Sequence, residues 1–289
     1  MDKKPLRGRI QLCAALIQNA HIRGFFTGDI YKGALKNGCV PGLNCYSCPG
    51  ALGACPIGSL QNALGARPVR FPYYVAGFLL FFGALLGRAV CGFLCPFGWI
   101  QELLHKIPFP RRKVRSFPGD RPLRYLKYGV LAVFVIALPL AFEYLPAFCK
   151  FICPAGTLEG GIPIVALNGQ RYQFQLGFLF GWKVGVMAAV LLLCLVLYRP
   201  FCKYLCPLGA LYGWLNKVAL YRMRNDAEKC VRCGTCAAVC PMGVDPAKTP
   251  NSAECIRCGA CVRVCPVRSL ELSFSPGRAP GAGKRPEAE

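Results

Sequence analysis

The sequence predicts a mainly α-helical fold: a polytopic membrane helical bundle of about four spans, followed by a small α+β domain near the C-terminus. Three observations predict it. Hydrophobic residues make up 54% of the 289 positions and charged residues only 17%, which is unusual for a soluble protein of this size. The 20 cysteines lie mostly in short clusters. Several cysteines are followed directly by proline, a residue that favours the first turn of a helix.

Four apolar segments are the candidate spans, because a membrane helix needs about 20 predominantly apolar residues. Three of them approach that length: residues 71–87, 126–147 and 176–198. The fourth, residues 10–26, carries Gln18, Asn19, His21 and Arg23, so it is either a span facing the bundle or an amphipathic helix at the interface. We favour a span, since an even number of crossings best fits the charges.

Basic residues set the predicted orientation. They gather before the first span and after the second, at Lys3, Lys4, Arg7, Arg9, Lys106, Arg111, Arg112, Lys113, Arg115 and Arg121. Such ends stay on the cytoplasmic side, so both termini are expected there. The formal charge of +22 would also suit nucleic acid, but motifs for base stacking or groove reading are absent. Membrane lipid is therefore expected as a partner and nucleic acid is not.

A Cys-Pro-x-Gly motif occurs four times along the predicted bundle. The copies are "CPIGSLQ", "CPFGWIQ", "CPAGTLE" and "CPLGALY", beginning at Cys55, Cys95, Cys153 and Cys206. Each of the last three follows a second cysteine by four residues; these are Cys91, Cys149 and Cys202. Proline after the cysteine starts a helix and leaves the first N–H groups unpaired, which should lower the thiol pKa and favour an anionic metal cluster. Small residues for close helix packing are the alternative, but four copies favour ligation.

Two CxxxCP pairs on one side of the membrane supply four thiolates. We therefore expect an inner cluster on Cys91, Cys95, Cys202 and Cys206. An outer cluster would use Cys149 and Cys153 with two of Cys39, Cys45, Cys48 and Cys55. The remaining two would be idle, disulfide-bonded or part of a further centre. Cys13 and Cys194 lie in spans without partners and are expected to be small core residues.

Sites at opposite surfaces of the membrane would be separated by a hydrocarbon core about 30 Å thick. Electrons would cross that distance slowly unless the CxxxCP loops dip inward, which is possible for broken helices that are buried in protein. If the loops stay at the surface, a quinone or a partner subunit has to bridge the gap.

The C-terminal part carries a more specific signal. "CVRCGTCAAVCP" and "CIRCGACVRVCP" both read CxxCxxCxxxCP, the spacing of bacterial 2[4Fe-4S] ferredoxins, in which the last cysteine of each run binds the other cluster. One cluster is expected on Cys230, Cys233, Cys236 and Cys265, and the other on Cys255, Cys258, Cys261 and Cys240. Structural zinc rarely needs so many close thiolates. The predicted domains are residues 1–222, 223–272 and a disordered tail at 273–289, with an amphipathic helix, "LYGWLNKVALYRM", joining the first two.

The chain resembles the membrane polyferredoxins of the NapH/NosR type, which are 4Fe-4S binding integral membrane proteins. The resemblance covers nearly all of residues 5–270 and rests on "CGFLCP", "CKFICP", "CKYLCP" and the two ferredoxin runs. It implies electron transfer at a prokaryotic cytoplasmic membrane, in relatives that oxidise quinol, support nitrous-oxide reductase maturation or assist copper-oxidase assembly. The segment "CVPGLNCYSCPGALGACPIG", residues 39–58, differs from the NapH pattern.

These features predict an electron-transfer component rather than a stand-alone enzyme, with two [4Fe-4S] clusters in the ferredoxin domain and two in the membrane domain. It would relay single electrons between a soluble ferredoxin or flavoprotein inside and a partner in or beyond the membrane, without a catalytic residue. Two alternatives stay open: a quinol dehydrogenase subunit that binds quinone, and a redox maturation factor for another metalloenzyme. With two histidines, no CxxCH and no S/T-G-A-T sequence, neither haem nor covalent flavin is expected.

Overall fold

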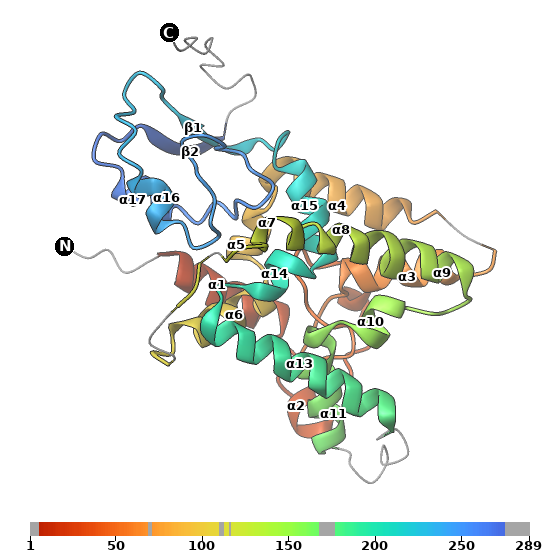
Figure 1. Ribbon diagram of the computed structural model, residues 1–289. Coiled ribbons are helices and arrows are strands. Elements are labelled where there is room, and N and C mark those ends of the chain that lie inside the picture. Colours follow the sequence, from red (N-terminus) through yellow and green to blue (C-terminus); the bar gives the residue numbers. More distant parts are fainter. Residues whose placement is uncertain (1–5, 69–70, 110–112, 116, 168–176, 275–289) are drawn as a thin grey trace.

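The computed structural model describes residues 6–68, 71–109, 113–115, 117–167 and 177–274. Helices dominate residues 6–220, which we call the helical body (Figure 1). Residues 221–274, which we call the ferredoxin module, form two antiparallel strands, β1 (Tyr221–Asn225) and β2 (Leu270–Phe274), with α16 (Thr235–Val239) and α17 (Ala260–Val264) between them. Figure 1 shows the module at one end of the body, away from α3 and α9. A mainly helical fold with a small α+β unit is confirmed.

Two helical stretches are long and apolar enough to cross a membrane. One runs over Asp120–Ala141 through α7 (Asp120–Leu123), α8 (Leu126–Val130), the π-helical η2 (Leu131–Ala137) and α9 (Leu138–Ala141). The other is α13 (Phe178–Val196). A buried core helix would pass the same test of composition, but only 28% and 17% of their apolar windows are buried. Both helices therefore present apolar side chains outward.

The other two predicted spans are shorter than expected. The helix α4 (Tyr73–Leu86) has 14 residues, which span about 21 Å at 1.5 Å per residue. Residues 10–26 do not form one helix, because α1 (Leu6–Gln18) ends before a turn and α2 (Gly24–Thr27) is a separate short helix. The described residues thus support two candidate spans and leave the four-span bundle unconfirmed.

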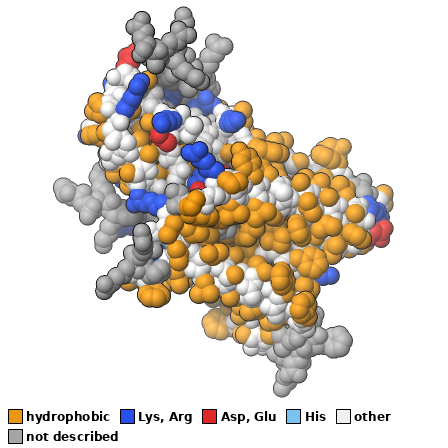
Figure 2. Space-filling view, viewed as in Figure 1, with side chains coloured by type: hydrophobic (Ala, Val, Ile, Leu, Met, Phe, Trp, Pro, Cys, Tyr) orange, Lys and Arg blue, Asp and Glu red, His pale blue; other side chains and the backbone are white. Residues whose placement is uncertain are grey.

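Apolar side chains cover much of the surface of the helical body (Figure 2). The exposed residues include Leu80 and Phe81 on α4, Ile136 on η2, and Leu192 and Leu193 on α13. Soluble monomers rarely expose apolar patches beyond a few hundred Å². On the face drawn in Figure 2, Lys and Arg gather mostly over the ferredoxin module and its junction with the body. This distribution suits a body in contact with lipid and a module in contact with water.

Short helices that begin at Cys-Pro pack inside the body. Proline is the first residue of α3 (Pro56–Gly65), α6 (Pro96–Lys106) and α15 (Pro207–Leu215), as the sequence predicts. After the third copy the chain winds into the π-helical η3 (Gly156–Gly161) and then α11 (Ile162–Leu167). The upstream cysteines of the CxxxCP pairs lie on three five-residue helices, α5 (Ala89–Phe93), α10 (Ala147–Phe151) and α14 (Pro200–Tyr204). Each pair therefore sits at a break between two helices.

Residues 39–55, which we call the cysteine loop, follow the 3₁₀ helix η1 (Ala34–Asn37). One expectation about the connection to the ferredoxin module is wrong. The predicted amphipathic helix over residues 211–223 ends with α15 at Leu215, and the chain enters β1 at Tyr221. Backbone pairing of Tyr221 with Phe274 across β1 and β2 outweighs the helical pattern of the segment.

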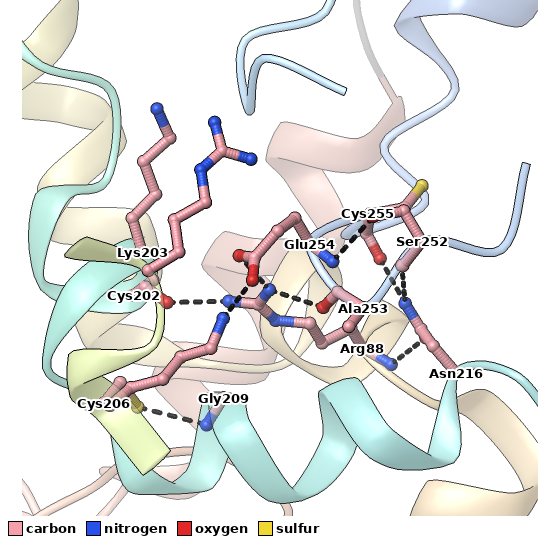
Figure 3. A network of polar contacts seen from close by, with 12 residues as sticks. Arg88, Cys202, Lys203, Cys206, Gly209, Asn216, Ser252, Ala253, Glu254 and Cys255 are labelled. Carbon is pink, nitrogen blue, oxygen red and sulfur yellow. Dashed lines mark hydrogen bonds and ion pairs between the residues drawn. The ribbon is translucent and has the colours of Figure 1, made fainter. Parts of the chain in front are cut away.

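Buried charges join the ferredoxin module to the body. The Arg88 guanidinium, which is fully buried, donates to Ala253 O at 2.6 Å and pairs with Glu254 Oε2 at 2.7 Å (Figure 3). Its other terminal nitrogen donates to Cys202 O at 2.6 Å. The Lys127 ammonium donates to the second oxygen of Glu254. One carboxylate of the module thus neutralises two buried cations of the body, and we call this group the charge clamp (Arg88, Lys127 and Glu254).

Asn216 and Arg257 extend the clamp with neutral and backbone partners. Asn216 Nδ2 donates to Ser252 O and to Cys255 O, each at 2.8 Å, and its Oδ1 accepts from Arg88 N at 2.8 Å. Arg257 donates to Leu86 O and Asn216 O at 2.8 Å. The bonds from Asn216 and Arg257 cross between the module and the body at several points, which fixes how the module sits on the body.

Replacing Glu254 tests the clamp. The Glu254→Gln variant leaves Arg88 and Lys127 buried without a carboxylate, so we expect the free energy of unfolding to fall by about 3 kcal/mol. Chemical denaturation in detergent, followed by tryptophan fluorescence, measures it. The matched control is Glu143→Gln, whose pair with Arg67 at 3.5 Å is solvent-exposed and should contribute at most about 1 kcal/mol. Equal losses in the two variants would contradict the clamp.

Candidate iron-sulfur sites

The structure brings together the four cysteines of the predicted inner site. Cys91, Cys95, Cys202 and Cys206 are all buried, with 4–7% of each residue exposed. The charges of Cys91, Cys95 and Cys202 all act on the Cys206 thiol, so the four sulfurs are near neighbours. They come from two CxxxCP breaks that lie far apart in sequence. Packing of Phe97 against Phe201, with ring centroids 5.3 Å apart, holds these breaks side by side.

A second group joins Cys45 and Cys55 to Cys149 and Cys153. Charges on Cys45, Cys55 and Cys149 all act on Cys153. These four cysteines also line one cavity of about 930 Å³. Glycine lets the backbone approach the sulfurs at this cavity. A Cβ on Gly156 would lie 3.8 Å from the sulfurs of both Cys45 and Cys153. Of the four candidates for completing the predicted outer site, the structure therefore places Cys45 and Cys55 beside the CxxxCP pair.

Cys39 and Cys48 do not line this cavity. The Cys39 sulfur lies 3.8 Å from Ser59 Oγ, and the Cys48 sulfur lies 3.6 Å from Asn19 Oδ1. All 20 cysteines lie within the described residues and are unpaired thiols, so the disulfide alternative for the surplus pair is not found. Cys194 is fully buried, as expected for a core residue, whereas Cys13 is exposed on α1 and that expectation is wrong. The outward face of α1 explains the difference.

The cysteine loop touches both groups of sulfurs. Leu43 N donates to Cys95 Sγ at 3.4 Å, and the backbone N–H of the next residue, Asn44, lies near enough to the Cys55 sulfur to lower the pKa of that thiol. Both residues are buried. Since successive residues lie about 3.8 Å apart, the two sulfurs approach neighbouring points of one short stretch of backbone. The wide separation expected for sites at opposite membrane surfaces is therefore not found.

Three of the four Cys-Pro-x-Gly motifs fold back on their own sulfur. The glycine N–H donates to the cysteine sulfur three residues earlier, at 3.4 Å for Gly98 and Cys95 and at 3.3 Å for Gly209 and Cys206. The same bond occurs at Cys153, from Gly156. At Cys55, the first residue of the remaining copy, the side chain accepts no such bond. The three motifs thus place a helix N-terminus against a thiol.

Burial outweighs this effect on the thiol pKa. Desolvation raises the pKa of Cys55 to about 12, although backbone N–H groups of Gly58, Ile57 and Asn44 act in the opposite direction. Desolvation likewise raises the pKa of Cys149 to about 12. The expectation of a lowered pKa is therefore wrong for the protein alone. A thiolate at these positions needs a cation in contact with it, and the iron ions of a cluster fit that requirement.

The ferredoxin module brings cysteines of its two runs near one another. Cys230, Cys233, Cys236 and Cys265 line one cavity of about 400 Å³. The charges of Cys255, Cys258 and Cys240 act on Cys261, which brings the second set of four together. The two runs also share a backbone shape, with left-handed conformations at Arg232 and Gly234 in one and at Arg257 and Gly259 in the other. The last cysteine of each run thus reaches the first three of the other.

The geometry differs from that of a single-ion site. Among the described residues, no three His, Cys, Asp or Glu side chains are arranged to hold one metal ion. Two of the four cysteine groups instead line cavities, as thiolates that bind the corners of a [4Fe-4S] cluster do. The donor sets, four thiols in each of four groups, fit such clusters better than zinc.

Two functional candidates escaped the sequence interpretation. Gln61 Nε2 lies 3.3 Å from Cys149 Sγ, and Gln101 Nε2 lies 3.2 Å from Cys202 Sγ. Both glutamines stand six residues after the cysteine of a Cys-Pro-x-Gly motif, at the end of "CPIGSLQ" and "CPFGWIQ". The glutamine at the same position of two repeats could have identified these candidates from the sequence. The residues of the charge clamp carried no such pattern.

Comparison with protein families agrees with these groups. A 4Fe-4S binding domain matches residues 71–116, 127–162 and 178–224, which contain the three CxxxCP pairs. A 4Fe-4S dicluster domain matches residues 222–266, which contain both ferredoxin runs. Iron-sulfur clusters are thereby supported as the cofactor. No solved structure matches the chain.

Several curated proteins are similar to the chain over part of its length. The methylamine utilization ferredoxin-type protein MauN of Paracoccus denitrificans is 29% identical over 186 residues, 63% of this chain and 59% of that protein. The putative electron transport protein YccM of Escherichia coli is 33% identical over 162 residues, 54% and 42% of the two chains. The ferredoxin-type protein NapH of Haemophilus influenzae is 28% identical over 164 residues, 56% and 50%. The chain spans about half the length of these relatives.

The close approach of the cysteine loop to α6 gives a test of this geometry. A Cβ on Gly42 would lie 2.8 Å from Cys95 Cα and 3.1 Å from Leu94 O, so Gly42→Ala forces backbone apart. We expect a loss of about 1–3 kcal/mol in the free energy of unfolding, measured by denaturation in detergent.

Gly77→Ala is the matched control for this variant. Its Cβ meets no heavy atom within 4 Å, so alanine should be neutral or stabilising within helix α4. Indistinguishable stability of the two variants would contradict the packing of the loop against Cys95.

Proposed function

Because the chain is a 4Fe-4S polyferredoxin of the NapH/NosR type, we propose that it relays single electrons between a cytoplasmic redox protein and a partner in or beyond the membrane. The cytoplasmic partner is a soluble ferredoxin or a flavoprotein. One electron entering at either end leaves at the other, so the chain itself undergoes no net change. The similarity to ferredoxin-type and electron-transport proteins supports electron transfer; the partners are our proposal.

Four groups of cysteines would hold the clusters, and each [4Fe-4S] cluster supplies one-electron redox chemistry when bound. The distal site is Cys230, Cys233, Cys236 and Cys265, and the proximal site is Cys255, Cys258, Cys261 and Cys240. The inner site is Cys91, Cys95, Cys202 and Cys206, and the outer site is Cys45, Cys55, Cys149 and Cys153. Cys39 and Cys48 are not assigned.

The single observation that carries the proposal is the cysteine loop between the inner and outer sites. Leu43 N donates to Cys95 Sγ of the inner site, and the backbone N–H of the next residue, Asn44, acts on the Cys55 thiol of the outer site. Both residues are buried. The Tyr212 side chain is also fully buried, and its hydroxyl donates to Pro41 O at 3.1 Å. Charges from Cys91 and Cys95 of one site and from Cys55 of the other act on that tyrosine. Buried protein atoms therefore lie between the two sites.

The charge clamp supports the connection between the proximal site and the inner site in the same way. Arg88 contacts Cys202 O of the inner site and Glu254, the residue before Cys255 of the proximal site. A Cβ on Gly92 would lie 2.4 Å from Ile256 O, so the two backbones nearly touch there. The sites thus follow one another in the order distal, proximal, inner and outer. Cys233 of the distal site is exposed, which suits contact with a soluble partner.

Quinol oxidation is a second candidate, and the cavity at the outer site favours it. At about 930 Å³ it falls within the range of sites for small organic ligands, about 300–1,000 Å³. Its wall continues past the cysteines to Ile164, Val165, Leu179 and Phe180 on α11 and α13, with Lys150 and Lys183 at the same cavity. An apolar wall with a few polar groups beside a cluster suits a quinone ring.

Iron and sulfide counts with EPR on anaerobically purified protein test the relay. Four clusters predict about sixteen irons per chain. Cys45→Ala should remove about four irons and one reduced-cluster signal, whereas Cys48→Ala, in the same loop, should keep all sixteen. A full complement in Cys45→Ala together with a loss in Cys48→Ala would overturn the outer site as assigned. About twelve irons or fewer in the unaltered protein would remove at least one of the four clusters.

Titration with a reduced quinone separates the two candidate functions. The relay predicts no change in the EPR signals of the purified protein on addition of quinol, and the second candidate predicts reduction of the outer site. Val165→Trp fills the cavity wall and should abolish any such reduction while leaving reduction by dithionite intact. Reduction by quinol that survives this substitution would place quinone elsewhere.

A further inference from the structure

We propose that Gln61 and Gln101 set the reduction potentials of the outer and inner membrane clusters, each by donating an amide hydrogen bond to one cysteine sulfur of its cluster. This inference rests on the proposed function, because it needs clusters at both sites. The two residues are positioning residues for electron transfer and would not exchange electrons themselves. Their role follows from four observations: contact, fixed orientation, burial and repetition.

At the outer site the orientation of Gln61 is determined by its partners. The amide oxygen accepts from Phe148 N at 2.9 Å, and this backbone group can only donate. The amide nitrogen must therefore face the other way, where it donates to Cys149 Sγ at 3.3 Å and to Ile57 O at 3.2 Å. The residue is 1% exposed, so water does not compete for the sulfur.

At the inner site Gln101 has the same arrangement. Its amide nitrogen donates to Cys202 Sγ at 3.2 Å and to Phe97 O at 3.4 Å, a carbonyl that can only accept. The amide oxygen faces the Cys194 thiol, 4.0 Å away on α13. Gln101 is fully buried. In both cases the glutamine comes from one Cys-Pro helix and its sulfur from the opposite CxxxCP pair.

The equivalent position of the other two repeats does not contact sulfur. Glu159, six residues after Cys153, accepts from Cys45 N at 2.8 Å. Tyr212, six residues after Cys206, donates to Pro41 O. Among the described residues, each membrane site therefore receives one side-chain amide donor to sulfur, from Gln61 or Gln101. The two membrane sites are built alike. At each site one Cys-Pro-x-Gly repeat supplies the amide donor, and a different CxxxCP pair supplies the sulfur that accepts it.

A donor aimed at a coordinating sulfur stabilises the reduced cluster more than the oxidised one, because the reduced form carries one more negative charge. Burial strengthens the effect, since the local dielectric constant is low. Removing the donor should therefore lower the reduction potential of that cluster. A change of about tenfold in the equilibrium constant for reduction corresponds to about 59 mV for a one-electron couple.

The test is a redox titration of the full-length protein in detergent or nanodiscs, monitored by EPR. Gln101→Leu should shift the inner cluster alone by about tenfold in its reduction equilibrium, toward lower potential. Gln61→Leu should shift the outer cluster alone, in the same direction. The matched control is Gln11→Leu, which removes a buried amide that donates to Gly92 O at 2.9 Å rather than to sulfur. That variant should leave both potentials unchanged.

The outcomes distinguish this inference from the relay itself. Full iron content with unshifted potentials in both glutamine variants would overturn the role of the amides and leave the relay intact. Equal shifts of the reduction potentials in Gln11→Leu would mean that the loss of any buried amide has this effect. That result would also overturn the role of Gln61 and Gln101. Missing membrane clusters in the unaltered protein would instead remove the relay.

A second measurement keeps the inference testable if a variant loses its cluster. Loss is a concern for Gln61→Leu, because Phe148 N would have no acceptor. Unaltered protein labelled with ¹⁵N at the glutamine side-chain amide is reduced and examined by pulsed EPR. Hyperfine coupling from labelled nitrogen to the reduced membrane clusters supports the hydrogen bonds. Its absence at both clusters would overturn them.

Discussion

The structure depends on placing anionic sulfur inside an apolar body. Burial alone favours the neutral thiol, as it does at Cys55 and Cys149. The Cys-Pro-x-Gly repeat offsets part of this penalty with a helix N-terminus and a glycine N–H, and the remainder has to come from a cation at the sulfur. The same requirement explains why cysteines from distant segments meet in fours. A helix can break at this depth only because neighbouring protein and sulfur take up its free backbone groups.

The buried cations of the body serve this arrangement as well. Arg88 and Arg199 are both fully buried, and each donates to the carbonyl of a cysteine at the inner site. Their positive charges face Glu254 and Glu102 respectively. Much of the basic excess of the sequence is exposed, but these residues lie within reach of the cysteine groups. Part of the net charge is therefore structural rather than a surface for an anionic partner.

Motif spacing predicted the helix starts better than hydropathy predicted the spans. Proline and cysteine act locally, so the starts of α3, α6 and α15 could be placed from the sequence. The choice of Cys45 and Cys55 could not, because it depends on how a loop without regular structure packs against η3 and α6. The charge clamp could not be predicted for a similar reason. Glu254 and Arg88 are 166 positions apart, and a single pair at that distance forms no repeat in the sequence. Two of the predicted spans, residues 10–26 and 71–87, are longer than the helices observed there, because polar residues and turns end those helices early.

The charge clamp also bears on how the ferredoxin module exchanges electrons. A domain on a flexible linker can act as a mobile carrier, which accepts an electron in one position and donates it in another. Here Glu254 and Asn216 hold the segment around Cys255 against the body through several buried bonds. In the relay proposed above the module is fixed, so electron transfer through it should not depend on solvent viscosity. Docking of the external partner then becomes the diffusive event on that side.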